Sequence, residues 1–141
     1  VVHTVLGRTD SAWFGHVDQR PGAPQGYSLW NDTPVLCLPG NPVAAFVDFQ
    51  LYARPFIAAL SGHPAPRQRV NLRARVDSHL PASRGRPTIV PVTVDFQAAP
   101  AITSHLPHGS HRVVSLAGTN GFCIIASEPP AIGEDIIVYM Y

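Results

Sequence analysis

The sequence predicts an α/β segment followed by a small all-β, barrel-like domain. Up to about Gly62 the chain alternates between helical and extended patterns, in the order helix, strand, strand, helix. Beyond that point apolar residues recur at every second position, which is typical of strands with one buried face. The segment Gly62-His63-Pro64-Ala65-Pro66 cannot continue a helix. We therefore place a boundary there, between residues 1–65 and residues 66–141.

Within the first part, two helices and two strands are expected. Apolar residues at spacings of three and four indicate an amphipathic helix near the end of this part, and Pro55 should kink or divide it. Gly7 is a natural end for a helix at the start of the chain. The expected elements are residues 1–6 (helix), 12–17 (strand), 34–38 (strand) and 42–60 (helix).

The second part is expected to form a small antiparallel sheet or a partly closed barrel. The expected strands are residues 69–77, 88–96, 122–126 and 135–141, separated by prolines and glycines. Arg69, Arg73 and Arg75 lie on the polar face of the first of these strands. They could contact RNA phosphates, but no aromatic residue between them could stack on a base, so a solvated face is favoured.

The most informative local pattern is the corner at Pro39-Gly40-Asn41-Pro42, between an apolar strand and a helix. Asn41 is a good N-cap, and Pro42 suits the first helical position. We expect free N–H groups of the following residues, 43–45, to point back toward the end of the strand, where the helix dipole favours an anion. The alternative is a proline-stiffened turn that binds nothing.

Composition limits the possible functions. The chain has 141 residues, 45% of them apolar and 13% charged, so a core can be buried. Its net charge of +1 gives no general attraction to nucleic acid or to an anionic membrane. Cys37 and Cys123 lie in apolar runs and are expected to be free, buried thiols, which suits a reducing cytoplasm. No stretch is expected to approach the ~18 apolar residues of a membrane span.

Four blocks of sequence carry a resemblance to a known family. They are VDQRPGAP at 17–24, LPGNPVAAFVDFQLYARPFIAALSG at 38–62, HGSH with SLAGTNG at 108–121, and GED at 133–135. In this order they resemble the molybdopterin molybdenumtransferase family, which includes bacterial MoeA and the gephyrin E domain. The resemblance implies that residues 1–65 end a molybdopterin-binding, MogA-like three-layer domain, and that residues 66–141 are the barrel-like C-terminal domain. It also implies a longer parent protein, whose glycine-rich segment lies upstream.

The same resemblance implies a function in molybdenum cofactor biosynthesis, the insertion of molybdate into adenylylated molybdopterin with the help of Mg²⁺. Arg20 stands where the family has the first Lys of its KPGKP segment, whereas Ala23 replaces the second Lys. The implied binding residues for the pterin phosphate and molybdate are Arg20, Pro21, Gly22, Pro39, Gly40, Asn41, Pro42, Gly109, Ser110 and His111.

No metal ligands are expected in this chain. Asp48 lies about two turns into the helix and is expected to face the domain surface or a neighbour, and the remaining carboxylates are scattered. His105, His108 and His111 have regular spacing but no nearby fourth ligand, so they are expected to be loop histidines rather than a zinc site. The catalytic residues stay unknown, and the acidic ligands are expected upstream.

Two functions remain open at this stage. One is the enzyme, working as a homodimer, with other molybdenum cofactor synthesis proteins as candidate partners. The other is a non-catalytic relative that uses the same fold as a scaffold, which Ala23 favours slightly. The fragment alone is expected to be inactive.

Overall fold

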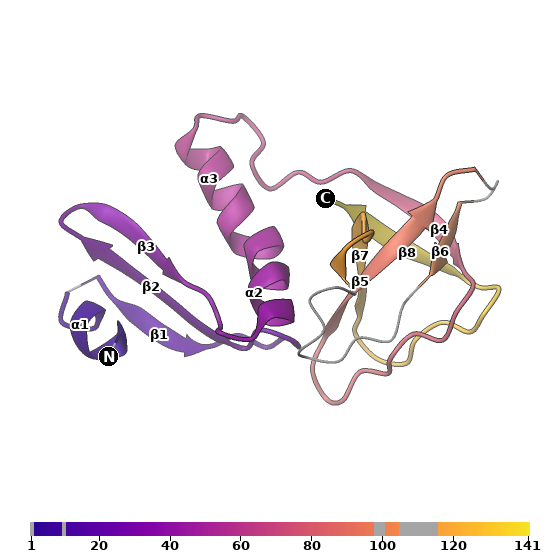
Figure 1. Ribbon diagram of the computed structural model, residues 1–141, viewed down its shortest axis with the longest axis horizontal. Coiled ribbons are helices and arrows are strands. Elements are labelled where there is room, and N and C mark those ends of the chain that lie inside the picture. Colours follow the sequence, from indigo (N-terminus) through magenta and orange to yellow (C-terminus); the bar gives the residue numbers. More distant parts are fainter. Residues whose placement is uncertain (1, 10, 98–100, 105–115) are drawn as a thin grey trace.

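The computed structural model describes residues 2–9, 11–97, 101–104 and 116–141. Figure 1 shows two parts side by side: a small sheet with helices, and a β-barrel. The helix α2 stands between them.

The first part is a short helix on an antiparallel sheet. Helix α1 (Val2–Leu6) precedes the strands β1 (Trp13–His16), β2 (Pro24–Trp30) and β3 (Thr33–Cys37), paired in the order β1-β2-β3. Strand β2 was not predicted, because Pro, Gly and polar residues interrupt its alternation. Among the described residues of this part all strand pairs are antiparallel. The three-layer domain implied by the resemblance is therefore not present in this chain.

The predicted long helix is present but irregular. It consists of α2 (Pro42–Asp48), a π-helical turn η1 (Phe49–Ala53) and α3 (Arg54–Leu60). The break lies just before Pro55, which takes the first turn of α3, where its missing N–H costs nothing. By length and composition alone, the whole 19-residue stretch is long and apolar enough to cross a membrane, contrary to our expectation. Core helices of soluble proteins pass the same test, and this helix packs on the barrel.

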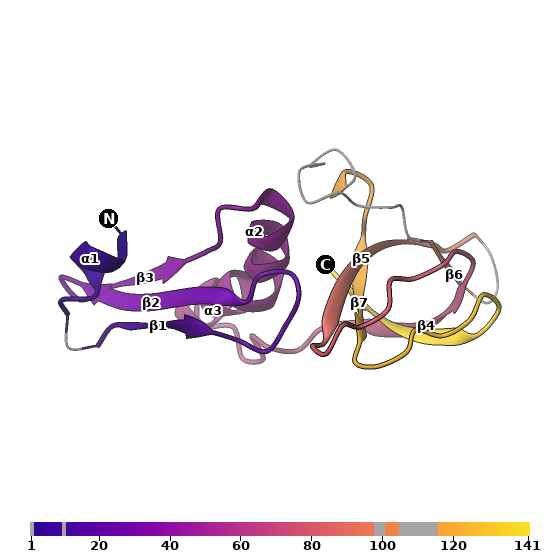
Figure 2. The same ribbon diagram turned by 90° about the horizontal axis from the view of Figure 1, so that it is seen from below.

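The second part is a closed barrel with the strand order β4-β6-β5-β7-β8. Its strands are β4 (Asn71–Val76), β5 (Thr88–Asp95), β6 (Ile102–Ser104), β7 (Gly121–Ile125) and β8 (Asp135–Met140). The four predicted strands are confirmed, whereas β6 has only three residues and gives no period in the sequence. The β4–β6 pair is parallel and the others are antiparallel. Figure 2 shows the strands curling round a common interior.

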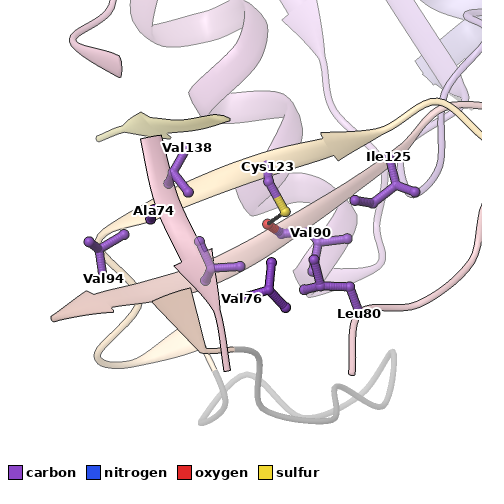
Figure 3. Packing of buried hydrophobic residues seen from close by; sticks show 9 residues of the cluster. Ala74, Val76, Leu80, Val90, Val94, Cys123, Ile125 and Val138 are labelled. Carbon is purple, nitrogen blue, oxygen red and sulfur yellow. Dashed lines mark hydrogen bonds between the residues drawn. The ribbon is translucent and has the colours of Figure 1, made fainter. Parts of the chain in front are cut away.

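Branched aliphatic side chains fill the barrel (Figure 3). Alternate residues of β4, β5, β7 and β8 point inward, as the period of two predicts. Cys123 lies among them as a free thiol with no exposed surface, and burial raises its pKa to about 12. The cluster consists of Ala74, Val76, Leu80, Val90, Val92, Val94, Cys123, Ile125 and Val138.

A second apolar cluster joins α2 to the barrel. Val47 of the helix packs with Ile89 of β5 and Phe122 of β7, all at most 5% exposed. Arg69 also contributes, since its guanidinium donates to the Gln50 carbonyl and lies 5.4 Å from the centre of the Phe122 ring. The expectation that Arg69 belongs to a solvated face is therefore wrong, because this side chain connects the helix to the barrel.

Candidate functional site

The corner before α2 forms as predicted, with one important difference. Asn41 caps the helix with φ −73° and ψ 125°, and Pro42 is the first helical residue. The Asn41 Oδ1 atom accepts hydrogen bonds from the N–H groups of Val43, at 3.1 Å, and Ala44, at 3.2 Å. The Ala45 N–H donates to the Asn41 carbonyl at 2.8 Å. The expectation that these three N–H groups are free for an anion is wrong, because the cap and the first turn occupy them.

Gly40 keeps this corner open. A Cβ atom built on Gly40 would have no heavy atom within 4 Å, and its backbone does not need a glycine conformation. Gly40 itself is exposed and adjoins the positive end of the helix. The protein's own packing therefore does not require glycine here, whereas a ligand that approaches the backbone closely would.

The turn at Arg20-Pro21-Gly22 is held by backbone contacts to the barrel. The Arg20 N–H donates to the Pro87 carbonyl at 2.8 Å, and the Ile89 N–H donates to the Arg20 carbonyl at 2.7 Å. The Arg20 side chain is exposed, with no ion pair among the described residues. The turn thus presents a fixed backbone and a free guanidinium, which binds oxyanions through several N–H groups.

Beneath this turn lies Asp48, which we expected to face the domain surface or a neighbour. Its side chain has no exposed surface and does not face the domain surface. Gly22, with φ +88°, packs so closely on it that a Cβ would overlap both carboxylate oxygens. The helical period puts Asp48 on the same face as Val47 and Ala44, which are buried, and this signal could have located it.

The Asp48 carboxylate is only partly satisfied. Gln19 donates through Nε2 to Asp48 Oδ1 at 2.7 Å, and Tyr52 donates through its hydroxyl to Gln19 Oε1. Asp48 Oδ2 has no hydrogen-bond partner. Burial raises the pKa of Asp48 to about 6, although the nearby polar side chains of Gln25 and Gln19 oppose the rise. The pKa of Tyr52 is also raised, by burial and then by the Asp48 charge.

The sheet brings the two predicted binding segments to one end of the first part. Strand β2 begins at Pro24 and β3 ends at Cys37, and the two strands are antiparallel, with Gly26 opposite Cys37. The turn before β2 and the corner after β3 therefore lie at the same end of the sheet, at the base of α2 (Figure 1). Gly22 packs on Asp48, seven residues after the cap, so about 10 Å along the helix axis separates the two contacts.

The third predicted segment, Gly109, Ser110 and His111, lies outside the described residues, together with His105 and His108. Within the described ranges no three His, Cys, Asp or Glu side chains are close enough together to hold a metal ion. Asp48 is a single buried carboxylate, already engaged by Gln19. The part of the chain that the structure describes therefore does not fit a Mg²⁺ site.

Comparison with known proteins places this architecture. Residues 73–139 match the family described as MoeA C-terminal region (domain IV). Molybdopterin molybdenumtransferase 2 of Mycobacterium tuberculosis H37Rv is 36% identical over 115 residues, which cover 82% of this chain and 28% of that protein. A putative molybdopterin biosynthesis protein of Methanocaldococcus jannaschii is 31% identical over 126 residues, covering 88% of this chain and 28% of that protein.

Solved structures agree in fold. A molybdenum cofactor biosynthesis protein from Pyrococcus furiosus matches with a TM-score of 0.76 and 27% identity, over 96% of this chain and 47% of that one. The molybdopterin biosynthesis MoeA protein from Pyrococcus horikoshii matches with a TM-score of 0.76 and 23% identity over 100% of this chain and 34% of that one, and it supports the fold alone. The chain spans 28% of the length of these curated relatives. It belongs to the molybdopterin molybdenumtransferase (MoeA) family, and its barrel is the C-terminal region of that family.

Proposed function

We propose that the protein carrying this chain inserts molybdate into adenylylated molybdopterin during molybdenum cofactor biosynthesis. The names of its relatives support this reaction, since they are molybdopterin molybdenumtransferases and molybdopterin biosynthesis proteins. The observation that carries the proposal to this chain is the position of the Arg20–Gly22 turn and the Pro39–Pro42 corner at one end of the sheet.

Each segment has a distinct task in this proposal. The Arg20 guanidinium binds molybdate or phosphate oxygens from the rigid turn. Gly40 allows the pterin substrate to approach the backbone, while Asn41 fixes the start of the helix beside it. Gly109, Ser110 and His111 are assigned to the same pocket by the resemblance. Mg²⁺ is proposed to be held by residues elsewhere in the protein, and none of these steps depends on it.

The proposed assembly is a cytoplasmic homodimer, as the family resemblance implies, with other molybdenum cofactor synthesis proteins as candidate partners. A non-catalytic scaffold with the same fold is the alternative. Ala23, in the position of a family Lys, favours the scaffold, whereas Arg20 and the open corner favour the enzyme. The chain alone is proposed to be inactive, because its described residues provide no metal site.

The test is substrate binding and turnover by the intact protein that carries this chain. Calorimetric titration with molybdopterin should show binding, and Gly40→Val should abolish it without lowering the unfolding temperature, because the site is sterically open. Arg20→Ala should raise the molybdate concentration needed for cofactor formation, whereas Arg73→Ala, an exposed control on β4, should not. Pterin binding without turnover would favour the scaffold. Unchanged pterin affinity in Gly40→Val would show that the corner does not hold the substrate.

A further inference from the structure

The Asp48 carboxylate lies directly beneath the Arg20–Gly22 turn, on the side that faces α2. The Asp48 side chain has no exposed surface, and a Cβ atom built on Gly22 would lie 2.6 Å from the carboxylate carbon. Figures 1 and 2 both show the connection between β1 and β2, which contains this turn, reaching the base of α2. An anion held by Arg20 would therefore be separated from a buried acid only by the backbone of the turn.

A chain of side-chain hydrogen bonds joins Asp48 to the turn. Gln19 is 6% exposed and donates through Nε2 to Asp48 Oδ1 at 2.7 Å and to the Pro21 carbonyl at 2.9 Å. Tyr52 donates its hydroxyl to Gln19 Oε1, which fixes the end of the Gln19 amide that faces Asp48. The network thus supplies one donor to the acid, while Asp48 Oδ2 keeps no hydrogen-bond partner.

No opposite charge pairs with Asp48 among the residues that the structure describes. Its polar neighbours are neutral: Gln19 before the turn, Gln25 of β2 and Tyr52 of η1, whose pKa burial and then the Asp48 charge raise. On the barrel side, the residues that pack on α2 are apolar. The charged residues of this region lie on the other face of the turn, where a hollow is lined by Arg20, Arg84 and Arg86, and Asp18 pairs with Arg86. Burial without an opposite charge therefore favours the neutral acid.

We infer that Asp48 takes up a proton from solvent when the Arg20 turn binds an oxyanion. An ionised Asp48 repels a dianion across the turn, and because the side chain has no exposed surface this repulsion is poorly screened. The neutral acid removes the repulsion, so the anion binds this form more tightly. Because linkage is reciprocal, a bound anion favours the protonated acid by the same factor. Asp48 is then a determinant of how strongly the proposed anion site binds a dianion, and in this respect the inference rests on the proposed function.

The expected pH dependence follows from the ionisation of Asp48 with and without the anion. Well below pH 6 the acid is neutral in both cases, and the affinity is at its maximum. As the pH rises through about 6, the free protein ionises first and the affinity falls, until the bound protein ionises too. A dianion about 10 Å from the acid gives a difference of at least about tenfold at an effective dielectric constant of about 20. A tenfold linkage corresponds to the uptake of about half a proton per anion near pH 6.5.

The experiment is calorimetric titration of the intact protein with sulfate and with molybdate, both dianions from about pH 5.5 to about pH 7.5. Titrations in two buffers with different heats of ionisation, at one ionic strength, give the number of protons taken up per anion. For a tenfold linkage, the unmodified protein should bind about sixfold more weakly at the upper limit than at the lower one. Asp48→Asn should take up no proton and should bind about eightfold more tightly than the unmodified protein at the upper limit.

Two further variants complete the design. Asp32→Asn is the matched control and should take up protons as the unmodified protein does, because Asp32 is exposed and lies at the opposite end of the sheet. Gln19→Leu removes the hydrogen bond that favours the ionised acid, so the uptake should be centred at a higher pH. Urea unfolding of each variant checks that the fold is retained.

The inference fails if the unmodified protein binds both anions without taking up protons, or if the uptake persists in Asp48→Asn. In either case, weaker binding by Arg20→Gln would leave the proposed function intact. Should Asp48→Asn fail to fold, an unshifted uptake in Gln19→Leu overturns the inference instead. If the unmodified protein binds neither anion, or Arg20→Gln binds both normally, the turn is not an anion site, and that part of the proposed function falls as well.

Discussion

Replacing Asp48 with Asn should remove a specific pH dependence of stability. Burial raises the pKa of Asp48 from its ordinary value of 3.8 to about 6 in the folded protein. Below pH 3.8 the carboxyl group is neutral in both states and costs nothing. As the pH rises toward 6, the unfolded chain releases this proton before the folded chain does, so the free energy of unfolding falls. Above about pH 6 both states are ionised and the penalty is constant.

The size of this penalty follows from the shift. A change from 3.8 to about 6 is about two pKa units, and each unit is worth about 1.4 kcal/mol, so Asp48 should cost about 3 kcal/mol at neutral pH. Asp48→Asn removes the ionisable group. It puts the amide N–H₂ in the place of Oδ2, which has no hydrogen-bond partner, and an unsatisfied buried amide costs about 1–3 kcal/mol of stability. We therefore expect little net change at pH 7 and a clear loss of stability at pH 4.

The assay is urea unfolding of the 141-residue chain between pH 4 and pH 7.5, followed by circular dichroism. The decisive quantity is the difference in the free energy of unfolding between each variant and the unmodified chain at each pH. Asp32→Asn is the control, because Asp32 is exposed and has φ 60°, a conformation that Asn tolerates. If Asp48→Asn loses as much stability as the unmodified chain between pH 4 and pH 6.5, Asp48 is not the buried acid described above.

Three further substitutions should change the free energy of unfolding, measured in the same urea experiment at pH 7. Gly22→Ala should lower the free energy of unfolding by ~1–3 kcal/mol, because φ at this position is +88° and the new methyl group would meet the Asp48 oxygens. If this variant is as stable as the unmodified chain, the turn is not packed on α2. Asn41→Ala should cost about 1 kcal/mol through loss of the cap, and no loss would contradict the observed bonds to the first turn. Phe122→Ala should lower the free energy of unfolding by about 3–5 kcal/mol. Ile124→Ala is the control and should cost much less, because Ile124 lies on the same strand and is 43% exposed. Equal effects of the two substitutions would contradict the assigned packing.

The sequence predicted the regular parts of the fold well, because their local signals were strong. Apolar residues alternate in β4, and the other three longer barrel strands are runs rich in β-branched and aromatic residues. The cap at Asn41 with Pro42 marks the start of α2 within one residue. Strands β2 and β6 were missed, since the first contains Pro, Gly and polar residues and the second has only three residues. Their pairing is set by neighbouring strands, and that tertiary information has no period in the sequence.

The candidate site was predicted less completely for a similar reason. Motifs located the turn, the corner and the Asn41 cap, but the expectation of free N–H groups overlooked that an N-cap side chain accepts hydrogen bonds from those same groups. Nor could motifs show Asp48 beneath Gly22, or Arg84 and Arg86 beside Arg20, because these contacts join segments far apart in the sequence. Long-range contacts of this kind depend on the packing of the two parts.

That packing connects the barrel to the proposed site. Helix α2 carries the corner at its start, supports the turn through Asp48 at its end, and packs through Val47 on Ile89 and Phe122. The Arg20–Gly22 turn also forms a backbone hydrogen bond with Ile89 of β5. The helix, the turn and the barrel therefore each contact the other two. A shift of α2 on the barrel would move Asp48, on which Gly22 packs, relative to the bridge between Arg20 and Thr88. For this reason, a substitution in the apolar joint should weaken oxyanion binding as well as stability, whereas one in the barrel interior away from the joint should affect stability alone.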